Sequence, residues 1–109
     1  MNEVQIKPMS VNEAWQGKRF KTDKYKSFER SCLFLLPKLI IPLGELKISF
    51  EFGLSNSGND IDNSIKPFLD ILQKKYGFND SRIYEMNVKK IKVEKGKEFI
   101  RFNIESLEK

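Results

Sequence analysis

Apolar residues follow two kinds of repeat along the chain, and these repeats predict the secondary structure. Residues 46–54 have the clearest strand pattern, because every second residue from Leu46 to Leu54 is apolar. One face of this strand should be buried and the other polar. Less regular alternation predicts three more strands, at residues 4–6, 82–93 and 99–104.

Two helices are predicted by apolar residues that recur about every 3.6 positions. The first begins after Thr22, which can act as its N-cap, and Pro37 should end or kink it. The second begins at residues 63–64, because Pro67 lacks an N–H and fits only the first turn. Gly77 then stands where a C-terminal glycine would stop this helix.

The connections complete the predicted order of elements. Residues 9–21 form an irregular basic loop that carries Trp15. The apolar phase changes along the 82–93 strand, which indicates a bulge near residues 89–90, and residues 94–97 predict a hairpin turn. The order β-α-β-α-β-β predicts an α+β fold. We expect a single small domain over residues 1–109, with a mixed sheet packed against two helices.

Length and composition exclude several classes of protein. A chain of 109 residues has room for one core. One cysteine and no histidine exclude an internal disulfide, the usual Cys/His zinc sites and catalysis by a Ser-His-Asp or Cys-His set. The N-terminus lacks an apolar leader pattern, and no apolar run is long enough to span a membrane. We therefore expect no membrane partner and a cytoplasmic location.

The net charge of +5 and the pI of about 9.3 favour an anionic partner. The positive charge is concentrated in residues 7–26, with six basic and two acidic residues, and in residues 86–97, with five basic and one acidic. An aspartate-rich segment, 59–80, lies between them. The two basic segments are therefore expected to hold a phosphate backbone on either side of an acidic centre.

The most specific motif is the run Asp60-Ile61-Asp62-Asn63, with Lys66 following, and a later Asp80 after a turn that contains Gly77. This pattern resembles the signature of the RusA family of Holliday-junction resolvases. The segment Lys7-Pro8-Met9-Ser10-Val11-Asn12 is similar to the opening Pro-x-Ser-x-Asn segment of that family. The order of elements agrees along nearly the whole chain.

The resemblance implies a magnesium-dependent, structure-selective endodeoxyribonuclease that acts in DNA recombination and repair. Its partner would be branched, four-way DNA, cut by paired symmetric nicks, and the protein would be a homodimer. Asp60, Asp62 and Asp80 would hold Mg²⁺, with Mn²⁺ as a possible substitute, and Lys66 would be needed for cleavage. Asn79 departs from the family, whose members often have an acid there.

The chemistry of phosphodiester hydrolysis supports the same residues. The reaction needs a hard cation to neutralise charge and acidify water, and Mg²⁺ prefers carboxylate oxygens. Three carboxylates in one site would repel one another without a cation, so we expect them to converge on one. Lys66 would stabilise the negative charge that develops on the phosphate. Asn63 and Asp70 would not bind the metal themselves but would contact the residues that do. The residues expected to contact DNA are Lys7, Asn12, Lys18, Arg19, Lys21, Lys24, Lys66 and Lys89.

Each of these residues also has a purely structural interpretation. Asp60 and Asp62 are common residue types in turns and at helix N-caps. Lys66 and Asp70, four residues apart, could form a surface ion pair. Ser10 and Asn12 could cap a turn. A structural role for Trp15, in the core or an interface, is favoured over stacking on an unpaired base.

Three alternative functions follow from these interpretations. A calcium-binding loop is excluded, because Ile65 and Ile71 stand where its glycine and glutamate should be. A catalytically silent nucleic-acid-binding module would keep the fold and the basic surface. A nuclease for other branched or flapped DNA would use the same acidic residues.

Overall fold

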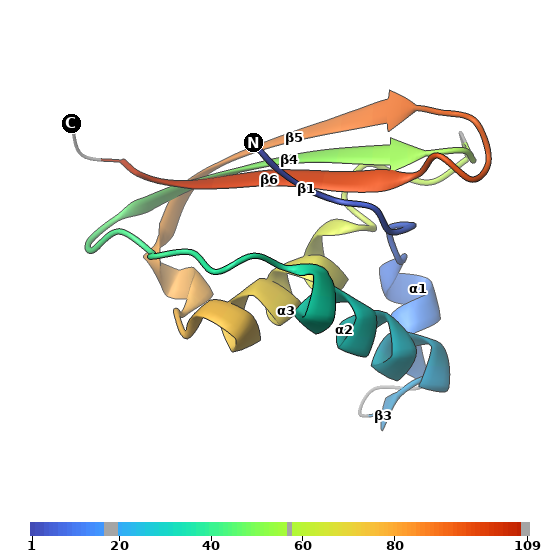
Figure 1. Cartoon of the computed structure of the whole chain (residues 1–109), viewed down its shortest axis with the longest axis horizontal. Helices are drawn as coiled ribbons and strands as arrows, with labels where there is room; N and C mark the ends of the chain where they lie inside the picture. The colour runs from blue at the N-terminus through green and yellow to red at the C-terminus, as the bar shows by residue number, and fades with distance from the viewer. Residues whose placement is uncertain (17–19, 57, 108–109) are drawn as a thin grey trace.

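The computed structural model describes residues 1–16, 20–56 and 58–107, which form a mixed four-stranded sheet with helices on one face (Figure 1). The sheet has the order β1-β6-β4-β5 and the fold is α+β, as predicted. The strands of this sheet are β1 (Asn2–Val4), β4 (Leu46–Leu54), β5 (Ile83–Lys92) and β6 (Phe99–Ser106). The helices are α1 (Val11–Ala14), α2 (Asp23–Leu35), α3 (Ile65–Tyr76) and the 3-10 turn η1 (Asp80–Arg82), and a separate ribbon pairs β2 (Trp15–Gln16) with β3 (Phe20–Lys21).

Local sequence signals set the start of α2 and the ends of both long helices, as predicted, while α3 begins at Ile65, just after the predicted residues 63–64. Thr22 caps α2, because its hydroxyl accepts a hydrogen bond from the N–H of Tyr25 (3.1 Å). The helix ends two residues before Pro37. Helix α3 ends at Gly77, whose φ of 69° places it in the left-handed region and whose N–H donates to the Gln73 carbonyl (2.9 Å).

Aromatic packing joins α3 to the centre of the sheet. Phe50 and Phe52 of β4 stack with ring centroids 5.4 Å apart. Phe68 of α3 meets the Phe50 ring edge-on at 6.0 Å and the Phe102 ring of β6 at 5.6 Å. All four side chains are at most 1% exposed. Such pairs contribute about 0.5–1.5 kcal/mol each beyond the burial of their area, so they fix α3 across the sheet.

The strand pairing differs from the predicted hairpin between the last two strands. Residues 94–97 do form a turn, in which the N–H of Lys97 donates to the Glu94 carbonyl (3.0 Å). However, β5 pairs in parallel with one side of β4, and β6 pairs antiparallel with the other side. The turn therefore joins strands that are not neighbours. Helix α3 provides the crossover that two parallel strands require.

The predicted bulge at residues 89–90 is wrong. The register of β4 and β5 shifts instead between Leu46 and Lys47, where the paired residues pass from Ile83 to Glu85. From there to Lys92 the pairing is regular. Because the apolar pattern changes phase without a bulge, Ile91, the last apolar residue of β5, lies on the outer face of the sheet, where it pairs with Gly53.

Three further differences lie at loops and strand ends. The predicted basic loop at residues 9–21 contains α1 and strands β2 and β3. The first strand is Asn2–Val4 and not 4–6, because the pairing with β6 covers only these three residues. The last strand extends beyond residue 104 to Ser106, because β6 continues to pair with β4 as far as Leu46.

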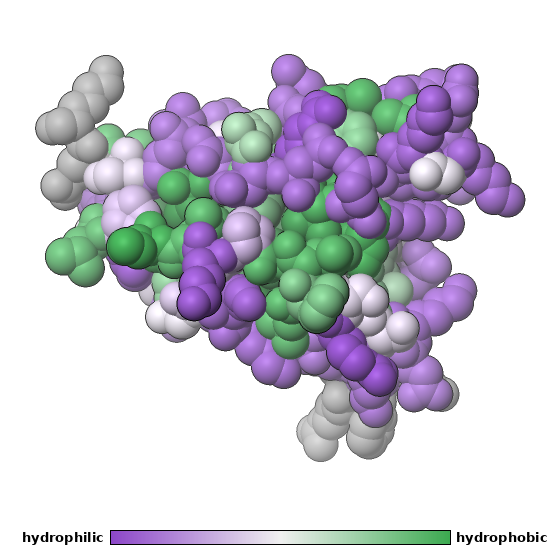
Figure 2. Space-filling model, in the orientation of Figure 1, coloured by the Kyte–Doolittle hydropathy of each residue, from purple (hydrophilic) through white to green (hydrophobic). Residues whose placement is uncertain are grey.

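Some apolar surface lies outside the core. Figure 2 shows apolar side chains on this face of the molecule, along the layer between the sheet and the helices. In the segment that joins α2 to β4, Ile40 is 98% and Leu43 is 89% exposed. In the described part of the chain, no helix has both the length and the apolar content needed to cross a membrane.

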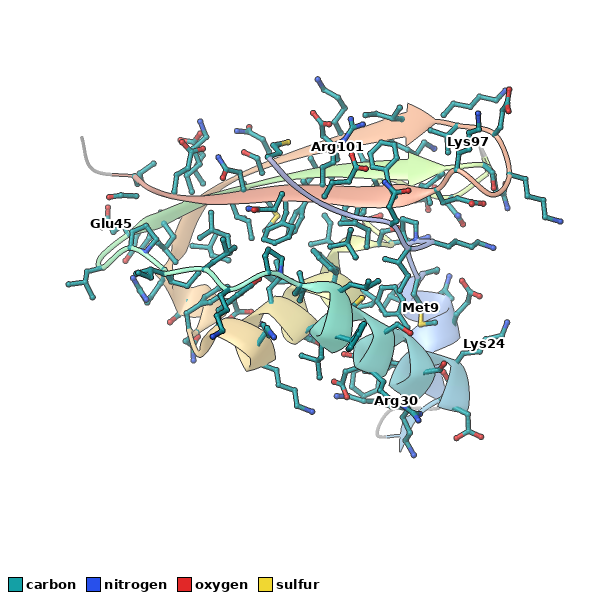
Figure 3. All side chains as sticks on the ribbon, viewed as in Figure 1. Met9, Lys24, Arg30, Glu45, Lys97 and Arg101 are labelled. Carbon is teal, nitrogen blue, oxygen red and sulfur yellow. The ribbon has the colours of Figure 1, made fainter. Side chains whose placement is uncertain are left out.

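The outer face of the sheet carries ion pairs around one aromatic side chain. Arg101 lies on this face (Figure 3), where its guanidinium contacts Glu3 (2.6 Å) and Glu51 (3.2 Å) and stacks on the Phe99 ring at 4.1 Å. The ring of Phe99 occupies the space above Gly53, where an added Cβ would lie 2.4 Å from two ring atoms. A larger residue at position 53 would therefore force the Phe99 ring to move.

Gly53→Ala should lower the free energy of unfolding by about 1–3 kcal/mol, because the new methyl group overlaps the Phe99 ring. Urea denaturation measures this loss. The double variant Gly53→Ala/Phe99→Ala should be less destabilised than the two single losses combined, since the overlap is gone. A Gly53→Ala protein as stable as the wild type would contradict this packing argument.

Candidate functional site

The turn between β4 and α3 carries Asp60 and Asp62. Its main chain forms two successive hydrogen-bonded turns. The N–H of Asn63 donates to the Asp60 carbonyl (3.1 Å), and the N–H of Ile65 donates to the Asp62 carbonyl (3.2 Å). Ser64 holds the N-cap position of α3 and is buried, so neither aspartate caps the helix. Both aspartates are exposed. The turn therefore presents two carboxylates to solvent from a locally closed main chain.

Helix α1 packs against this turn. The N–H of Val11 donates to the Asn63 carbonyl (2.8 Å). Ser10 caps α1, accepting from the N–H of Asn12 (3.1 Å), and its own N–H donates to Glu13 (3.4 Å) in a capping box. The structural role considered for Ser10 is thus confirmed. The exposed Asn12 lies one residue from the contact with the turn, so the opening segment and the aspartate motif are neighbours in space.

The chain that enters the turn is also held by side chains. The Ser55 hydroxyl donates to the Glu98 carboxylate (2.7 Å), and this hydrogen bond is the main reason why the pKa of Glu98 is lower than usual. Four residues on, the Asn59 carbonyl accepts a hydrogen bond from the Nζ of Lys90 (2.6 Å). Lys90 was not predicted to lie at the site. Its placement depends on the parallel pairing of β4 and β5, which no local pattern reveals.

Lys66 lies in the first turn of α3, close in sequence to the two aspartates. Its Nζ lies 3.5 Å from a carboxylate oxygen of Asp70, so the ion pair considered from the sequence is present. The Lys66 side chain is 62% exposed, against 28% for Asp70. An exposed pair of this kind is weak, and the ammonium group remains accessible to a ligand in solution.

Asp80 lies at the far end of α3 from the other two aspartates. The helix of 12 residues is about 18 Å long at 1.5 Å per residue. The main-chain N–H of Asp80 donates to the Gln73 side chain (2.8 Å), near the C-terminal end of that helix. Asp80 precedes β5, and Asp60 follows β4. Because these strands are parallel, the two aspartates belong to opposite edges of the sheet.

The expected convergence of three carboxylates is therefore not seen. Among residues 1–16, 20–56 and 58–107, no group of three or more Asp, Glu or Cys side chains is placed to hold a metal ion. Asp60, Asp62 and Asp80 do not form one three-ligand site within a single chain. Asp60 and Asp62 alone remain suited to Mg²⁺, which proteins often bind through one or two carboxylates together with water and substrate phosphates.

Two lysines of the first basic segment lie on a groove beside α1 and α2. The groove has a volume of about 340 Å³, and its lining includes Lys7, Lys24 and Ser27. Figure 3 shows Lys24 and Met9 at the same end of the molecule. The Nζ of Lys24 lies 3.6 Å from a carboxylate oxygen of Glu13, so part of its charge is already balanced.

The remaining residues of this segment are only partly described. The Nζ of Lys21 lies 4.8 Å from the centre of the Tyr25 ring and 3.9 Å from a carboxylate oxygen of Glu29. Burial, together with the charge of Glu29, raises the pKa of Tyr25. Lys18 and Arg19 lie outside the described residues, so their predicted contacts with DNA have no structural counterpart here.

Lys89 does not lie beside the aspartate turn. It pairs in register with Glu51, which puts both residues on the outer face of the sheet, away from the helices. Of these two neighbours, Lys90 and not Lys89 therefore lies on the side of the sheet that reaches the aspartate turn. Adjacent residues of a strand point to opposite faces, so a run of lysines is divided between them.

The structure thus describes an α+β domain with an exposed two-aspartate turn at the carboxyl end of a parallel strand. No protein-family model matches the chain, and no curated protein matches it.

Lys66→Met should change the free energy of unfolding by less than about 0.5 kcal/mol, because exposed ion pairs at this spacing contribute little. Asp70→Asn is the matched variant on the other side of the pair and should behave alike. Urea denaturation of both proteins tests this. A loss above about 1.5 kcal/mol in Lys66→Met would show that the lysine is a structural residue.

Proposed function

We propose that this protein is a magnesium-dependent, structure-selective endodeoxyribonuclease that resolves four-way DNA junctions during recombination and repair in the cytoplasm. The proposal rests on the motif formed by Asp60, Asp62, Asn63 and Lys66, which resembles the RusA family. The observation that carries it is the exposed turn after β4, which presents both aspartates within six residues of an accessible lysine.

Each residue of the turn has a role in the proposed reaction. Asp60 and Asp62 would hold Mg²⁺, with Mn²⁺ as a substitute, and the ion would supply charge neutralisation and a more acidic water. Lys66 would lie against the scissile phosphate and stabilise the negative charge that develops on its oxygens. Asn63 would support the turn through its main chain, which bonds to both Asp60 and Val11.

The basic residues would hold the DNA backbone. Lys7, Lys21 and Lys24 belong to the segments that surround α1, and α1 contacts the aspartate turn through Val11. Lysines that neutralise phosphates release condensed counterions, so binding should weaken as salt rises. Branched or flapped DNA other than four-way junctions would contact the same lysines and the same aspartate turn. Selectivity among these substrates would depend on the shape of the DNA.

A catalytically silent nucleic-acid-binding module is the second candidate, and the position of Asp80 favours it. A single chain offers two carboxylates at the turn and keeps the third at the far end of α3. A pure binding module would need the lysines but no ligand set. The two functions differ in whether Mg²⁺ causes DNA to be cut.

A homodimer is part of the proposal, because two symmetric nicks in a four-way junction call for two copies of a small active site. Analytical ultracentrifugation should therefore give twice the chain mass of 12.8 kDa. Adding junction DNA should leave two chains per junction. A 12.8 kDa species that persists with the junction bound would contradict the dimer.

Wild-type protein should nick a synthetic four-way junction in the presence of Mg²⁺ and stop cutting in EDTA. Asp62→Asn should abolish cutting and leave junction affinity within about threefold, because one carboxylate is lost and the basic surface remains. Lys66→Met should lower the cleavage rate by about 10²–10³-fold. Gel assays measure both binding and cleavage.

Three outcomes of that assay decide between the two candidates. Binding in EDTA with no cleavage in Mg²⁺ or Mn²⁺ would establish the silent binding module. Cleavage by Asp62→Asn at the wild-type rate would remove Asp62 from the reaction. Cleavage that depends on Mg²⁺ and on Asp62 would support the nuclease.

A further inference from the structure

Lys90 extends from β5 to the helix-covered side of the sheet. It pairs in register with Phe52, which is 1% exposed and belongs to the hydrophobic core. Paired residues of parallel strands point to the same face. Lys90 therefore follows Met86 and Val88 and precedes Lys92 on this face of β5, and its side chain is exposed.

The Nζ of Lys90 reaches the chain immediately before the candidate site. It donates to the Asn59 carbonyl at 2.6 Å, and Asp60 is the next residue. Hydrogen bonds with a charged donor are shorter and about twice as strong as neutral ones. The contact is possible because β4 and β5 are parallel, so the carboxyl ends of both strands lie at the same edge of the sheet.

This bond holds one end of the turn, and a second hydrogen bond holds the other end. The second joins the N–H of Val11 to the Asn63 carbonyl (2.8 Å). Asn59 and Asn63 are the residues on either side of the Asp60–Asp62 segment. The turn is thus fixed to β5 at its beginning and to α1 at its end, and the exposed aspartates lie between the two fixed points.

We propose that Lys90 is a positioning residue of the candidate site. By holding the Asn59 carbonyl, it sets the path of the main chain into Asp60 and so the direction in which Asp60 and Asp62 present their carboxylates. The role of those carboxylates rests on the proposed function. The anchoring of the turn does not, and it is measurable without any activity.

The adjacent residue Lys89 provides a matched control. It has the same side chain, it lies in the same strand, and it is exposed. It pairs with Glu51 on the outer face, so it points away from the turn. Lys90→Met and Lys89→Met therefore remove the same charge one residue apart, and only the first removes the bond to Asn59. Lys90→Arg keeps a charged donor at the position.

Amide NMR spectra test the anchoring. In Lys90→Met, the signals of residues 58–63 should shift, and the N–H of Asn63, which closes the turn on Asp60, should exchange with solvent at least about tenfold faster. Lys89→Met should leave these amides as in the wild type, and Lys90→Arg should restore them. Spectra of Lys90→Met that match the wild type at residues 58–63 would overturn the proposal.

Cleavage of the four-way junction tests the consequence for function. Lys90→Met should lower kcat by about 10–10²-fold with junction affinity within about threefold, since misplacing catalytic groups affects the chemical step. The loss should be larger in Lys90→Met than in Lys89→Met, which removes the same charge without the bond to Asn59, and Lys90→Arg should recover most of it. Thermal melting of each variant shows whether it is folded, and Lys90→Gln replaces Lys90→Met if the latter is not.

The two arms separate failure of this inference from failure of the proposed function. If the wild-type protein does not cut DNA, the nuclease is rejected, while the amide spectra still decide whether Lys90 anchors the turn. If the wild type cuts and Lys90→Met disturbs the turn without lowering kcat, the positioning role is overturned.

Discussion

The parallel pairing of β4 with β5 is the constraint on which the rest of the structure depends. Two parallel neighbours need a crossover, and α3 supplies it by packing Phe68 against the rings of Phe50 and Phe102. This geometry brings the carboxyl ends of both strands to one edge of the sheet, where the chain turns through Asp60. The same geometry carries Asp80 to the opposite edge.

The aspartate turn combines a fixed main chain with exposed side chains. Its own hydrogen bonds, the contact from Val11 and the bond from Lys90 hold the backbone, while Asp60 and Asp62 remain in solvent. This combination favours ligand binding, because a main chain that is already fixed loses little conformational entropy when the ligand binds. Lys66, four residues after Asp62, adds an accessible ammonium group in the first turn of α3.

The position of Asp80 separates the motif into two parts. Asp60, Asp62 and Lys66 are close in sequence and share one end of α3, so local chain geometry alone keeps them together. Asp80 has an independent environment, with its N–H bonded to Gln73 and its side chain on a groove that also contains Glu85. Within one chain, the chemistry open to the turn is that of two carboxylates and a lysine.

Local patterns determined much of this protein. The cap at Thr22, the alternation of β4 and the stop at Gly77 placed three elements correctly, because each depends on neighbours within a few residues. Strand pairing involves residues far apart in sequence, so it was decided only in the tertiary structure. The hairpin expected at residues 94–97, the bulge expected at residues 89–90 and the convergence expected of Asp80 all failed for this reason. The hydrogen bond from Lys90 to Asn59 could not be predicted for the same reason. The two residues are 31 positions apart in sequence, and the parallel pairing of β4 and β5 brings them together.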